Sequence, residues 1–551
     1  LISPGSRSAP LTVACAQHPG IATLPLLDER SAAFFALGHA KATGCPVALI
    51  CTSGTAAANF YPAVIEASLS QVPLLILSAD RPPELHHCRA GQTIDQGKLY
   101  GHYPNWQAEL ARPEASPEGL AYLRQLAIQA WGRSLQPQPG VVHLNVPLGE
   151  PLAPLPEAAV LAGAAAVDLE AFFATTRPLA SPRRSLPWPE AWQPEQRGLI
   201  IAGIAQPSQP DRYCAAVAQL AAGLGWPVLA EALSPLRHQA QRNPYLVSTY
   251  DLILRNPSLA KALRPEVVIQ LGELPTSKTL RAWLAAHPVP RWVVAPGPES
   301  RDPLQGLAIP WPVAVTDLQP REPLPAEGSG EYLAQWLAIA REAHHRLEAE
   351  LATQAELREG SVAWLLPQLL PPATPVLVAN SSPVRDVEYF WPLNSRGLRP
   401  WVNRGANGID GTLSTALGLA QGGPPTVLLT GDLALLHDTN GFLAAGRLAG
   451  SLTIVLLNNQ GGGIFEGLAI AAFDPPFEEY FATPQAVDFQ RLCATYGVEY
   501  QRLRDQNSLA LALQELPPQG VRLLEIRTNR RAEAHWRQAL FERLAAQLPQ
   551  L

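Results

Sequence analysis

Apolar residues in this chain are grouped into short runs, and the most informative pair lies between residues 426 and 465. TVLLTGD comes first, an apolar helix-like stretch follows, and LTIVLLNNQGGGIF closes the segment. Two runs rich in Val, Ile and Leu that end at polar residues are typical of buried parallel strands joined by a crossover helix. We expect Asp432 at the end of the first strand and Asn458 and Asn459 at the end of the second. Open α/β sheets bind ligands at this edge.

The same alternation continues along the chain and predicts an α/β fold with three Rossmann-like, parallel-sheet domains. The predicted strands lie in PVALICTSG, VPLLILSADRPPE and GVVHLNVP in the first unit, and in RGLIIAGIAQ, GWPVLAEA, EVVIQLGELPTS and RWVVAPGPES in the second. This rhythm is typical of βαβ units. The second unit lacks G-x-G-x-x-G, so we expect no dinucleotide there.

Changes in composition divide the chain into domains. Residues 151–195 are rich in Pro and Ala, and Pro and Gly are dense again around 318–330, which indicates linkers. A polar helix is expected from about Tyr332 to Glu359 and a final helix from Ala532 to Gln547. We predict a first domain with its trailing linker over 1–180, a middle domain over 181–325 and a last domain over 326–551.

Composition also excludes several classes of function. Hydrophobic residues make up 47% of the 551 residues and charged residues 16%, which is enough apolar material for several cores. The net charge of −6 and the lack of a basic run argue against nucleic-acid binding. No apolar stretch reaches about 18 residues, and the start does not resemble a signal peptide, so we expect a cytoplasmic protein without a membrane span.

Two smaller features concern the cysteines and the start of the chain. The six cysteines are scattered without a C-x-x-C pair, so we expect reduced, buried thiols. The chain contains no methionine and opens on Leu1 and Ile2 directly before a glycine turn. We therefore expect a helix and part of a strand to precede it.

The strand ends described above carry the residue types of a metal–phosphate site. Mg²⁺ takes roughly six oxygen ligands and is often held by one carboxylate, neutral oxygens and phosphate oxygens. Asp432 supplies a charge, Asn459 a neutral oxygen, and a carbonyl in the glycine run 461–463 a further ligand. The glycines also allow the backbone to approach a diphosphate. The alternative is two ordinary strand-to-helix loops, in which Asp and Asn are common.

The spacing of these residues resembles the metal–diphosphate motif of the thiamine-diphosphate enzymes, which runs Gly-Asp-Gly, then a spacer, then Asn-Asn. This chain departs from it at Leu433, which follows Gly431 and Asp432. The resemblance implies thiamine diphosphate and a Mg²⁺ ion, with Mn²⁺ as an alternative, held by Asp432, Asn459 and the carbonyl of Gly461. It also implies a pyrimidine-binding first domain, a middle domain often without cofactor, and a diphosphate-binding last domain.

Four further segments narrow the resemblance. They are SPGSRSAPLT from Ser3, LLDERSAAFFALGHAKATG from Leu26, SADRPPEL with GQTIDQ from Ser78, and VNRGANGIDGTLSTALG from Val402. Together they are similar to the family of 2-succinyl-5-enolpyruvyl-6-hydroxy-3-cyclohexene-1-carboxylate synthases. The resemblance implies a transferase of menaquinone or phylloquinone biosynthesis. It would decarboxylate 2-oxoglutarate and attach the succinyl-semialdehyde unit to isochorismate by 1,4-addition. A homodimer or homotetramer is also implied.

The resemblance assigns roles to residues of the cofactor site. Glu29, at the start of a predicted helix, matches the glutamate that hydrogen-bonds the pyrimidine ring, and Ile409 matches the apolar residue beneath the bent cofactor. Taken alone, Glu29 is an ordinary first-turn acid and Ile409 an ordinary core residue. The implied cofactor site comprises Glu29, Ile409, Gly431, Asp432, Asn459, Gly461, Ile464, Phe465 and Leu468.

Four arginines in predicted turns are candidates for binding carboxylates. Strand ends on one sheet edge converge, arginine binds carboxylates bidentately, and both implied substrates are dicarboxylates. A single surface arginine would be an ordinary solvated side chain. Lys278 is followed by Thr279, whereas the family often has a Lys-Arg pair. The implied substrate site comprises Ser6, Arg7, Arg81, Gln92, Lys278, Ser381, Arg385 and Arg404.

Two alternatives stay open on the sequence. A related thiamine-diphosphate enzyme, such as acetolactate synthase or a 2-oxoacid decarboxylase, would share Glu29 and the metal motif but would have no use for four arginines. An inactive α/β assembly or a nucleotide-binding module would leave Asp432 and Asn459 as loop residues.

Overall fold

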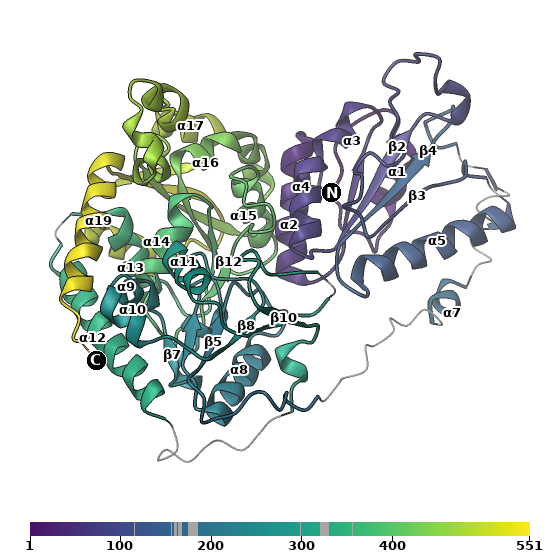
Figure 1. Cartoon of the computed structure of the whole chain (residues 1–551). Helices are drawn as coiled ribbons and strands as arrows, with labels where there is room; N and C mark the ends of the chain where they lie inside the picture. The colour runs from purple at the N-terminus through teal and green to yellow at the C-terminus, as the bar shows by residue number, and fades with distance from the viewer. Residues whose placement is uncertain are drawn as a thin grey trace.

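The computed structural model describes residues 1–114, 116–155, 157–158, 162–163, 168–174, 186–297, 299–319, 330–354 and 356–550. Within them the chain forms three parallel sheets in chain order, each flanked by helices (Figure 1). The predicted α/β class with three parallel-sheet domains is therefore confirmed. The predicted borders near residues 180 and 325 lie outside the described residues and stay predictions.

The first domain contains a four-stranded sheet in the order β1-β2-β4-β3. Strand β4 is buried along its whole length, as expected for an inner strand covered on both faces. The elements are α1 (Ala9–Gln17), α2 (Glu29–Thr43), β1 (Val47–Cys51), α3 (Thr55–Asn59), α4 (Tyr61–Leu69), β2 (Leu74–Asp80), η1 (Pro83–Leu85), β3 (Trp106–Glu109), α5 (Pro117–Leu135), β4 (Val141–Pro147) and α7 (Leu169–Ala174).

The middle domain contains a six-stranded sheet in the order β10-β9-β8-β5-β6-β7. Its elements are β5 (Gly198–Ala202), α8 (Pro210–Leu224), β6 (Val228–Ala230), η2 (Pro235–His238), η3 (Ala240–Arg242), β7 (Leu246–Val247), α9 (Tyr250–Leu254), α10 (Pro257–Ala262), β8 (Val267–Leu271), α11 (Lys278–Ala286), β9 (Arg291–Val294), β10 (Ala308–Trp311) and η4 (Val315–Asp317). The long helix α12 (Glu331–Ala352) follows and contributes Trp336 to the apolar core that the middle and last domains share.

The last domain has a six-stranded sheet in the order β12-β11-β13-β14-β16-β15. Its first elements are α13 (Glu359–Leu369), β11 (Pro375–Val378), α14 (Ser382–Phe390), β12 (Arg399–Trp401), α15 (Thr412–Ala420), β13 (Thr426–Gly431), α16 (Asp432–His437) and η6 (Thr439–Arg447). They are followed by β14 (Ser451–Asn458), η7 (Gly463–Gly467), η8 (Ala469–Ala472), the π-helix η9 (Glu478–Ala482), α17 (Phe489–Tyr496), β15 (Glu499–Leu503), α18 (Gln506–Gln514), β16 (Gly520–Arg527) and α19 (Arg530–Ala546).

The predicted strands all form, and β13 and β14 are parallel neighbours as expected. The crossover between these strands is an α-helix followed by a 3-10 helix. Asp438 separates the two helices, and its buried carboxylate accepts a hydrogen bond from Ser414 N at 2.7 Å. The final helix begins at Arg530, close to its predicted start.

One predicted helix is wrong in its extent. The helix expected from Tyr332 to Glu359 ends at Ala352, and a new helix begins at Glu359. The second helix has its own start, because Ser361 Oγ accepts a hydrogen bond from Arg358 N at 2.8 Å and so caps it. The prediction of buried thiols is also wrong for Cys45 and Cys88, which are exposed, although all six cysteines are free.

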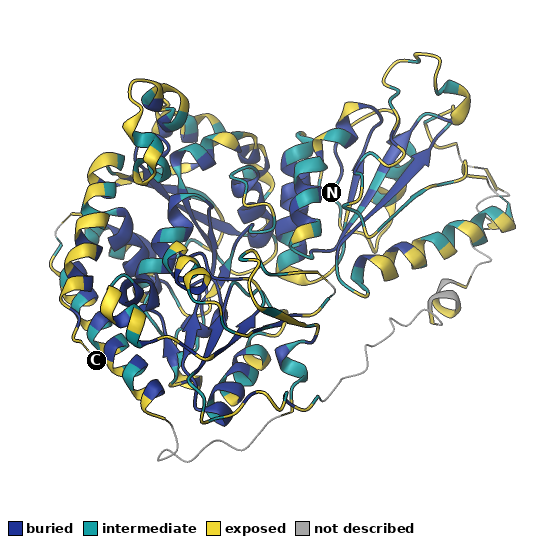
Figure 2. Ribbon diagram, in the orientation of Figure 1, coloured by how far each residue is buried: buried dark blue, intermediate teal, exposed yellow. Residues whose placement is uncertain are grey.

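Helices α2 and α15 lie side by side where the first domain meets the last (Figure 1). They approach closely because each carries a glycine at the contact. A Cβ on Gly38 would lie 2.0 Å from Thr415 O, and a Cβ on Gly418 would lie 2.0 Å from Phe35 O. Figure 2 shows this contact and the sheets as buried. Among the described helices none combines the length and the apolar character needed to cross a membrane.

Candidate active site

The carboxyl ends of β11, β13 and β14 surround a cavity of about 140 Å³ in the last domain. A larger cavity, of about 680 Å³ between the middle and last domains, is rich in prolines and contains no predicted site residue. The smaller cavity is lined by Glu359, Asn380, Ser381, Ser382, Pro383, Ile409, Gly431, Asp432, Leu433, Ala434, Leu457, Asn459, Gly461, Gly462, Gly463, Ile464 and Phe465.

Asp432 is held at the junction of β13 and α16, where the strand turns into the helix. Its carboxylate accepts hydrogen bonds from Leu433 N at 3.0 Å and Gly461 N at 2.8 Å, which joins the two strand ends. The residue is 3% exposed, and burial raises the pKa of Asp432 to about 6. A divalent cation at this carboxylate would counter the cost of burial and favour the ionised form.

Asn459 offers a side-chain oxygen for the same cation. Its Nδ2 donates to Glu359 Oε1 at 2.7 Å, which fixes the orientation of the amide. Its Oδ1 is buried and has no hydrogen-bond partner. A buried polar atom without a partner is unfavourable, and a cation ligated at this position would remove the deficit. Glu359 was not found from the sequence, because its contact spans 100 residues.

Gly461 completes the arrangement through its backbone. Its φ of 135° and its close approach to Ala482 O, 2.4 Å from a built Cβ, restrict this position to glycine. Its carbonyl accepts a hydrogen bond from Gly463 N at 2.9 Å and keeps a second lone pair. The described residues contain no group of three or more His, Cys, Asp or Glu that could hold a metal ion. Asp432 and Asn459 fit a Mg²⁺ ion that takes its other ligands from carbonyl, phosphate and water oxygens.

The apolar wall of the cavity comes from two segments. Ile409 lies in the turn before α15, where Gly411 adopts φ 63° and leaves room for Phe34 of α2, 1.9 Å from a built Cβ. Ile464 and Phe465 also line the cavity. Leu468 is 37% exposed and does not line the cavity. The structure therefore brings every predicted cofactor residue of the last domain except Leu468 to this cavity.

Two arginines lie next to the cavity. Arg385 Nη1 donates to Ser381 O at 2.5 Å, and Arg404 Nη1 donates to Asn380 Oδ1 at 3.2 Å, while the buried Arg404 Nε has no partner. Burial lowers the pKa of both arginines, and the nearby cation Arg281 lowers it further. Arginines that repel one another in a partly buried place fit an anionic ligand.

The middle domain contributes Arg281 to this group, a residue not found from the sequence. It lies on α11, where Nε and Nη2 donate to Pro275 O at 2.8 Å and Leu274 O at 3.0 Å. Lys278, which was predicted, is exposed at the first residue of that helix. The spacing of three residues places both cations on one helix face, a signal that would have found Arg281.

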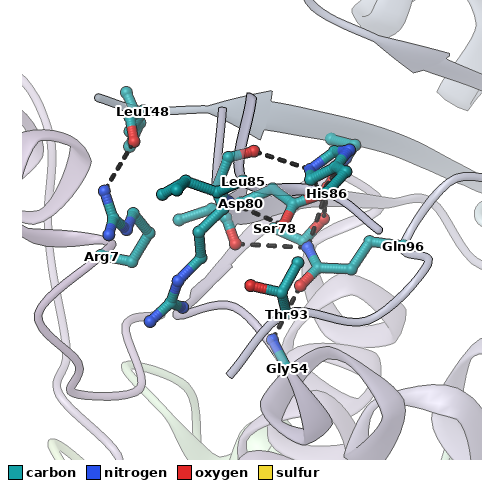
Figure 3. A network of polar contacts seen from close by, with 12 residues as sticks. Arg7, Gly54, Ser78, Asp80, Leu85, His86, Thr93, Gln96 and Leu148 are labelled. Carbon is teal, nitrogen blue, oxygen red and sulfur yellow. Dashed lines mark hydrogen bonds and ion pairs between the residues drawn. The ribbon is translucent and has the colours of Figure 1, made fainter. Parts of the chain in front are cut away.

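The other predicted substrate residues belong to the first domain, where Arg7 lies beside the carboxyl end of β4 (Figure 3). Arg7 is 7% exposed and donates to Leu148 O at 2.8 Å, and Arg81 donates to Gln92 O at 3.0 Å. Ser6 and Gln92 are exposed. Within one chain the four arginines thus form two pairs on two different sheets, Arg7 with Arg81 and Arg385 with Arg404. We expected all four at a single sheet edge, because strand ends converge there.

Glu29 is the first residue of α2. The preceding residue, Asp28, caps the helix by accepting a hydrogen bond from Ser31 N at 2.9 Å, and Arg30 donates to His437 O of the last domain at 2.9 Å. Glu29 does not line the cavity, and its carboxylate has no hydrogen-bond partner in the part of the chain that the structure describes. The start of the helix is thus held while the carboxylate is left unpaired.

Comparisons with known families match three successive parts of the chain. Residues 1–99 match the N-terminal thiamine-pyrophosphate-binding domain of thiamine pyrophosphate enzymes, and residues 177–378 match the middle domain. Residues 387–526 match the C-terminal thiamine-pyrophosphate-binding domain. The prediction of a thiamine-diphosphate enzyme is confirmed.

The fold and the sequence have related proteins. A benzoylformate decarboxylase structure from Polynucleobacter necessarius is 17% identical, with a TM-score of 0.65 over 96% of this chain and 95% of that chain. A 2-succinyl-5-enolpyruvyl-6-hydroxy-3-cyclohexene-1-carboxylate synthase from Acaryochloris marina is 53% identical over 98% of this chain and 94% of its own length. One from Microcystis aeruginosa is 54% identical over 97% and 94%. The chain therefore belongs to the family of 2-succinyl-5-enolpyruvyl-6-hydroxy-3-cyclohexene-1-carboxylate synthases, which are thiamine pyrophosphate enzymes.

Proposed function

We propose that this enzyme decarboxylates 2-oxoglutarate and transfers the succinyl-semialdehyde unit to isochorismate by 1,4-addition, with thiamine diphosphate and Mg²⁺ as cofactors. The proposal is supported by the relatives named above and by one observation that carries it: the cavity where Asp432 and the unpartnered oxygen of Asn459 meet, next to Arg385 and Arg404. The product would be 2-succinyl-5-enolpyruvyl-6-hydroxy-3-cyclohexene-1-carboxylate, a precursor in menaquinone or phylloquinone synthesis.

In this proposal the last domain binds the charged end of the cofactor. Asp432, Asn459 and the Gly461 carbonyl would hold Mg²⁺, or Mn²⁺ in its place, and Glu359 would keep the amide of Asn459 in the ligating orientation. Ile409 and the pair Ile464 and Phe465 would wall the organic part. Thiamine diphosphate, when bound, supplies the electron sink that decarboxylation of a 2-oxo acid requires. Leu468 is exposed and does not line the cavity, so it would not wall the cofactor within one chain.

The arginines would bind the carboxylates of the two substrates. Arg385, Arg404 and Ser381 lie at the cofactor cavity, so they would hold a carboxylate close to the reacting centre and fix its orientation. Lys278 is exposed and would contact substrate only at the entrance. The remaining predicted substrate residues belong to the first domain and are called the first-sheet set: Ser6, Arg7, Arg81 and Gln92.

Glu29 and the first-sheet set require a second copy of the chain in this proposal. Glu29 does not reach the cavity of its own chain, although its carboxylate is free to accept a hydrogen bond. A homodimer or homotetramer would place the first domain of one subunit against the last domain of another and so deliver Glu29 to the cofactor. There a carboxyl group in a closed site would share a proton with a ring nitrogen. We also propose a cytoplasmic location, which fits the six free thiols.

An assay of CO₂ release tests the proposal. With thiamine diphosphate and Mg²⁺ present, we expect release from 2-oxoglutarate that is faster with isochorismate and matched by an equal amount of the addition product. Release from pyruvate at the same rate, with no use of isochorismate, would instead support another 2-oxo acid decarboxylase or carboligase. No release from any 2-oxo acid would contradict the proposal as a whole.

A further inference from the structure

The loop that carries Arg404 in the last domain is held by the first domain of the same chain. Gly405 N donates to Glu66 Oε1 at 2.9 Å, and Ala406 N donates to Glu66 Oε2 at 2.7 Å. Glu66 lies on α4, is 3% exposed, and also accepts a hydrogen bond from Ser70 Oγ at 2.6 Å. One buried carboxylate thus binds the two backbone N–H groups that directly follow Arg404.

The backbone before Arg404 is also held by hydrogen bonds from other domains. Lys41 of α2 donates from Nζ to Val402 O at 2.7 Å and to Gln206 Oε1 of the middle domain at 3.2 Å. Gln206 Nε2 donates to the same Val402 carbonyl at 3.2 Å. Burial lowers the pKa of Lys41 to about 8, and the nearby Glu66 raises it. The backbone on both sides of Arg404 is therefore fixed by side chains from other domains.

The inner side of the loop faces the cofactor cavity. Asn380, which lines the cavity, donates from Nδ2 to Asn403 O at 2.6 Å and Gly408 O at 2.7 Å. Its Oδ1 accepts the hydrogen bond from Arg404 Nη1. Gly405 packs so closely on α4 that a built Cβ would lie 2.8 Å from Leu69 Cβ and 2.9 Å from Glu66 O. A small shift of this turn would therefore displace the Arg404 guanidinium.

We propose that Glu66 is a positioning residue for substrate binding, which acts by fixing the turn that directs Arg404 at a substrate carboxylate. This proposal rests on the proposed role of Arg404 above. Hydrogen bonds to an ionised acceptor are stronger than neutral ones, and two of them on consecutive N–H groups define the direction of the peptide plane. A bidentate arginine–carboxylate contact depends on such directional control, because its two bonds must form together. A mere link between domains would contribute to stability without affecting substrate affinity.

The test combines two single variants and their double variant. Glu66→Gln keeps one acceptor but places an amide NH₂ group opposite a backbone N–H. We expect it to raise KM about tenfold for the dicarboxylate whose KM Arg404→Ala raises, with little change in kcat. Because Glu66 acts through Arg404, the double variant should have the same KM as Arg404→Ala alone. Independent effects that multiply in the double variant would overturn the proposal.

Two further variants separate positioning from stability. Glu66→Asp keeps both acceptor oxygens and should recover part of the KM loss, and it serves as the test if Glu66→Gln does not fold. Asp302→Asn is the matched control, because Asp302 also accepts from two backbone N–H groups, Leu304 N at 3.0 Å and Gly306 N at 2.9 Å, but lies in the middle domain. The control should lower the melting temperature and leave KM unchanged.

The outcome also separates this proposal from the proposed function. Normal CO₂ release with an unchanged KM in Arg404→Ala would overturn the role of Arg404, and that of Glu66 with it, but not the reaction. A raised KM in Arg404→Ala and an unchanged KM in both Glu66 variants would overturn the positioning role alone.

Discussion

The carboxyl edges of the first and last sheets contain similar polar side chains, but only the first has a network in which these side chains pair with one another. At the first edge Ser78 Oγ lies 2.7 Å from His143 Nε2 and donates to Asn145 Oδ1 at 2.9 Å. Asn145 Nδ2 donates to Asp80 Oδ2 at 2.8 Å, and Gln96 joins Asn145 Oδ1 to Gly54 N. Figure 3 shows Gly54, Ser78, Asp80 and Gln96 of this network. At the last edge Asn459 Oδ1 and Arg404 Nε are buried without partners.

The difference indicates which polar groups form a scaffold and which are left to meet a ligand. A buried network whose members are all paired is rigid and gains nothing from an added ligand. Buried atoms without partners are unfavourable until a ligand meets them. Outside this network the first edge also has a buried atom without a partner, Arg7 Nε. We therefore propose that the paired network is a scaffold for the substrate residues of the first edge, and that the last edge binds the cofactor. Four experiments test this comparison.

Glu29→Gln should have the largest effect. Glu29 belongs to the first domain but lies outside its closed network, and we propose that it meets the cofactor of another subunit. General acid–base catalysis contributes typically 10²–10⁴-fold, so we expect a loss of kcat of that order with cofactor binding retained. Steady-state kinetics together with cofactor titration measure both. Full activity in this variant would refute the assigned role.

Asp432→Ala should abolish the stabilisation that thiamine diphosphate and Mg²⁺ give the protein. A ligand at 100 times its Kd adds about 2.7 kcal/mol, which thermal melting with and without both cofactors detects in the unmodified enzyme. Asp80→Asn is the matched change at the first edge. It should lower the melting temperature because it disturbs a buried network, yet keep the gain from the cofactors. An equal loss of that gain in both variants would contradict the comparison.

Arg385→Ala and Arg404→Ala should each raise KM for a dicarboxylate substrate more than they disturb folding. Hydrogen bonds to charged groups contribute about 1.5–3 kcal/mol, which corresponds to roughly 10- to 100-fold in affinity. Initial rates at varied 2-oxoglutarate and at varied isochorismate identify the substrate that each arginine binds. Unchanged KM for both substrates would remove the arginine from the pocket.

His143→Gln should have the smallest effect of the four. It should change the stability of the protein only at acidic pH. Burial lowers the pKa of His143 to about 4, below its ordinary value of 6.5. Between these values the unfolded chain binds more protons than the native one, so stability falls as pH drops from 6.5 towards 4. At pH 5.5 the loss is about 1 kcal/mol relative to pH 7.5.

Glutamine cannot be protonated but can still donate a hydrogen bond to Ser78 Oγ, whose own proton is donated to Asn145 Oδ1. Denaturant unfolding of both proteins at the two pH values gives the difference. The same loss in the variant and in the unmodified protein would show that His143 is not its source.

The sequence by itself determined the sheets, the placement of Asp432 and Asn459 at neighbouring strand ends, and the helix start at Glu29. These features follow from patterns within a few residues: apolar runs that end at polar turns, and an Asp28 cap before a helix. Local hydrogen bonding and side-chain alternation act over such short spans, so they leave a readable signal.

Only the tertiary structure decided how the site is supported. Glu359 orients Asn459 across 100 residues, Glu66 holds Gly405 across 339, and the arginines divide into pairs because they belong to different sheets. No periodic pattern marks a Glu that will face one particular backbone N–H group in another domain. Such contacts depend on how whole domains pack, as in the close approach of α2 to α15 at Gly38 and Gly418, and that packing is a property of the complete fold.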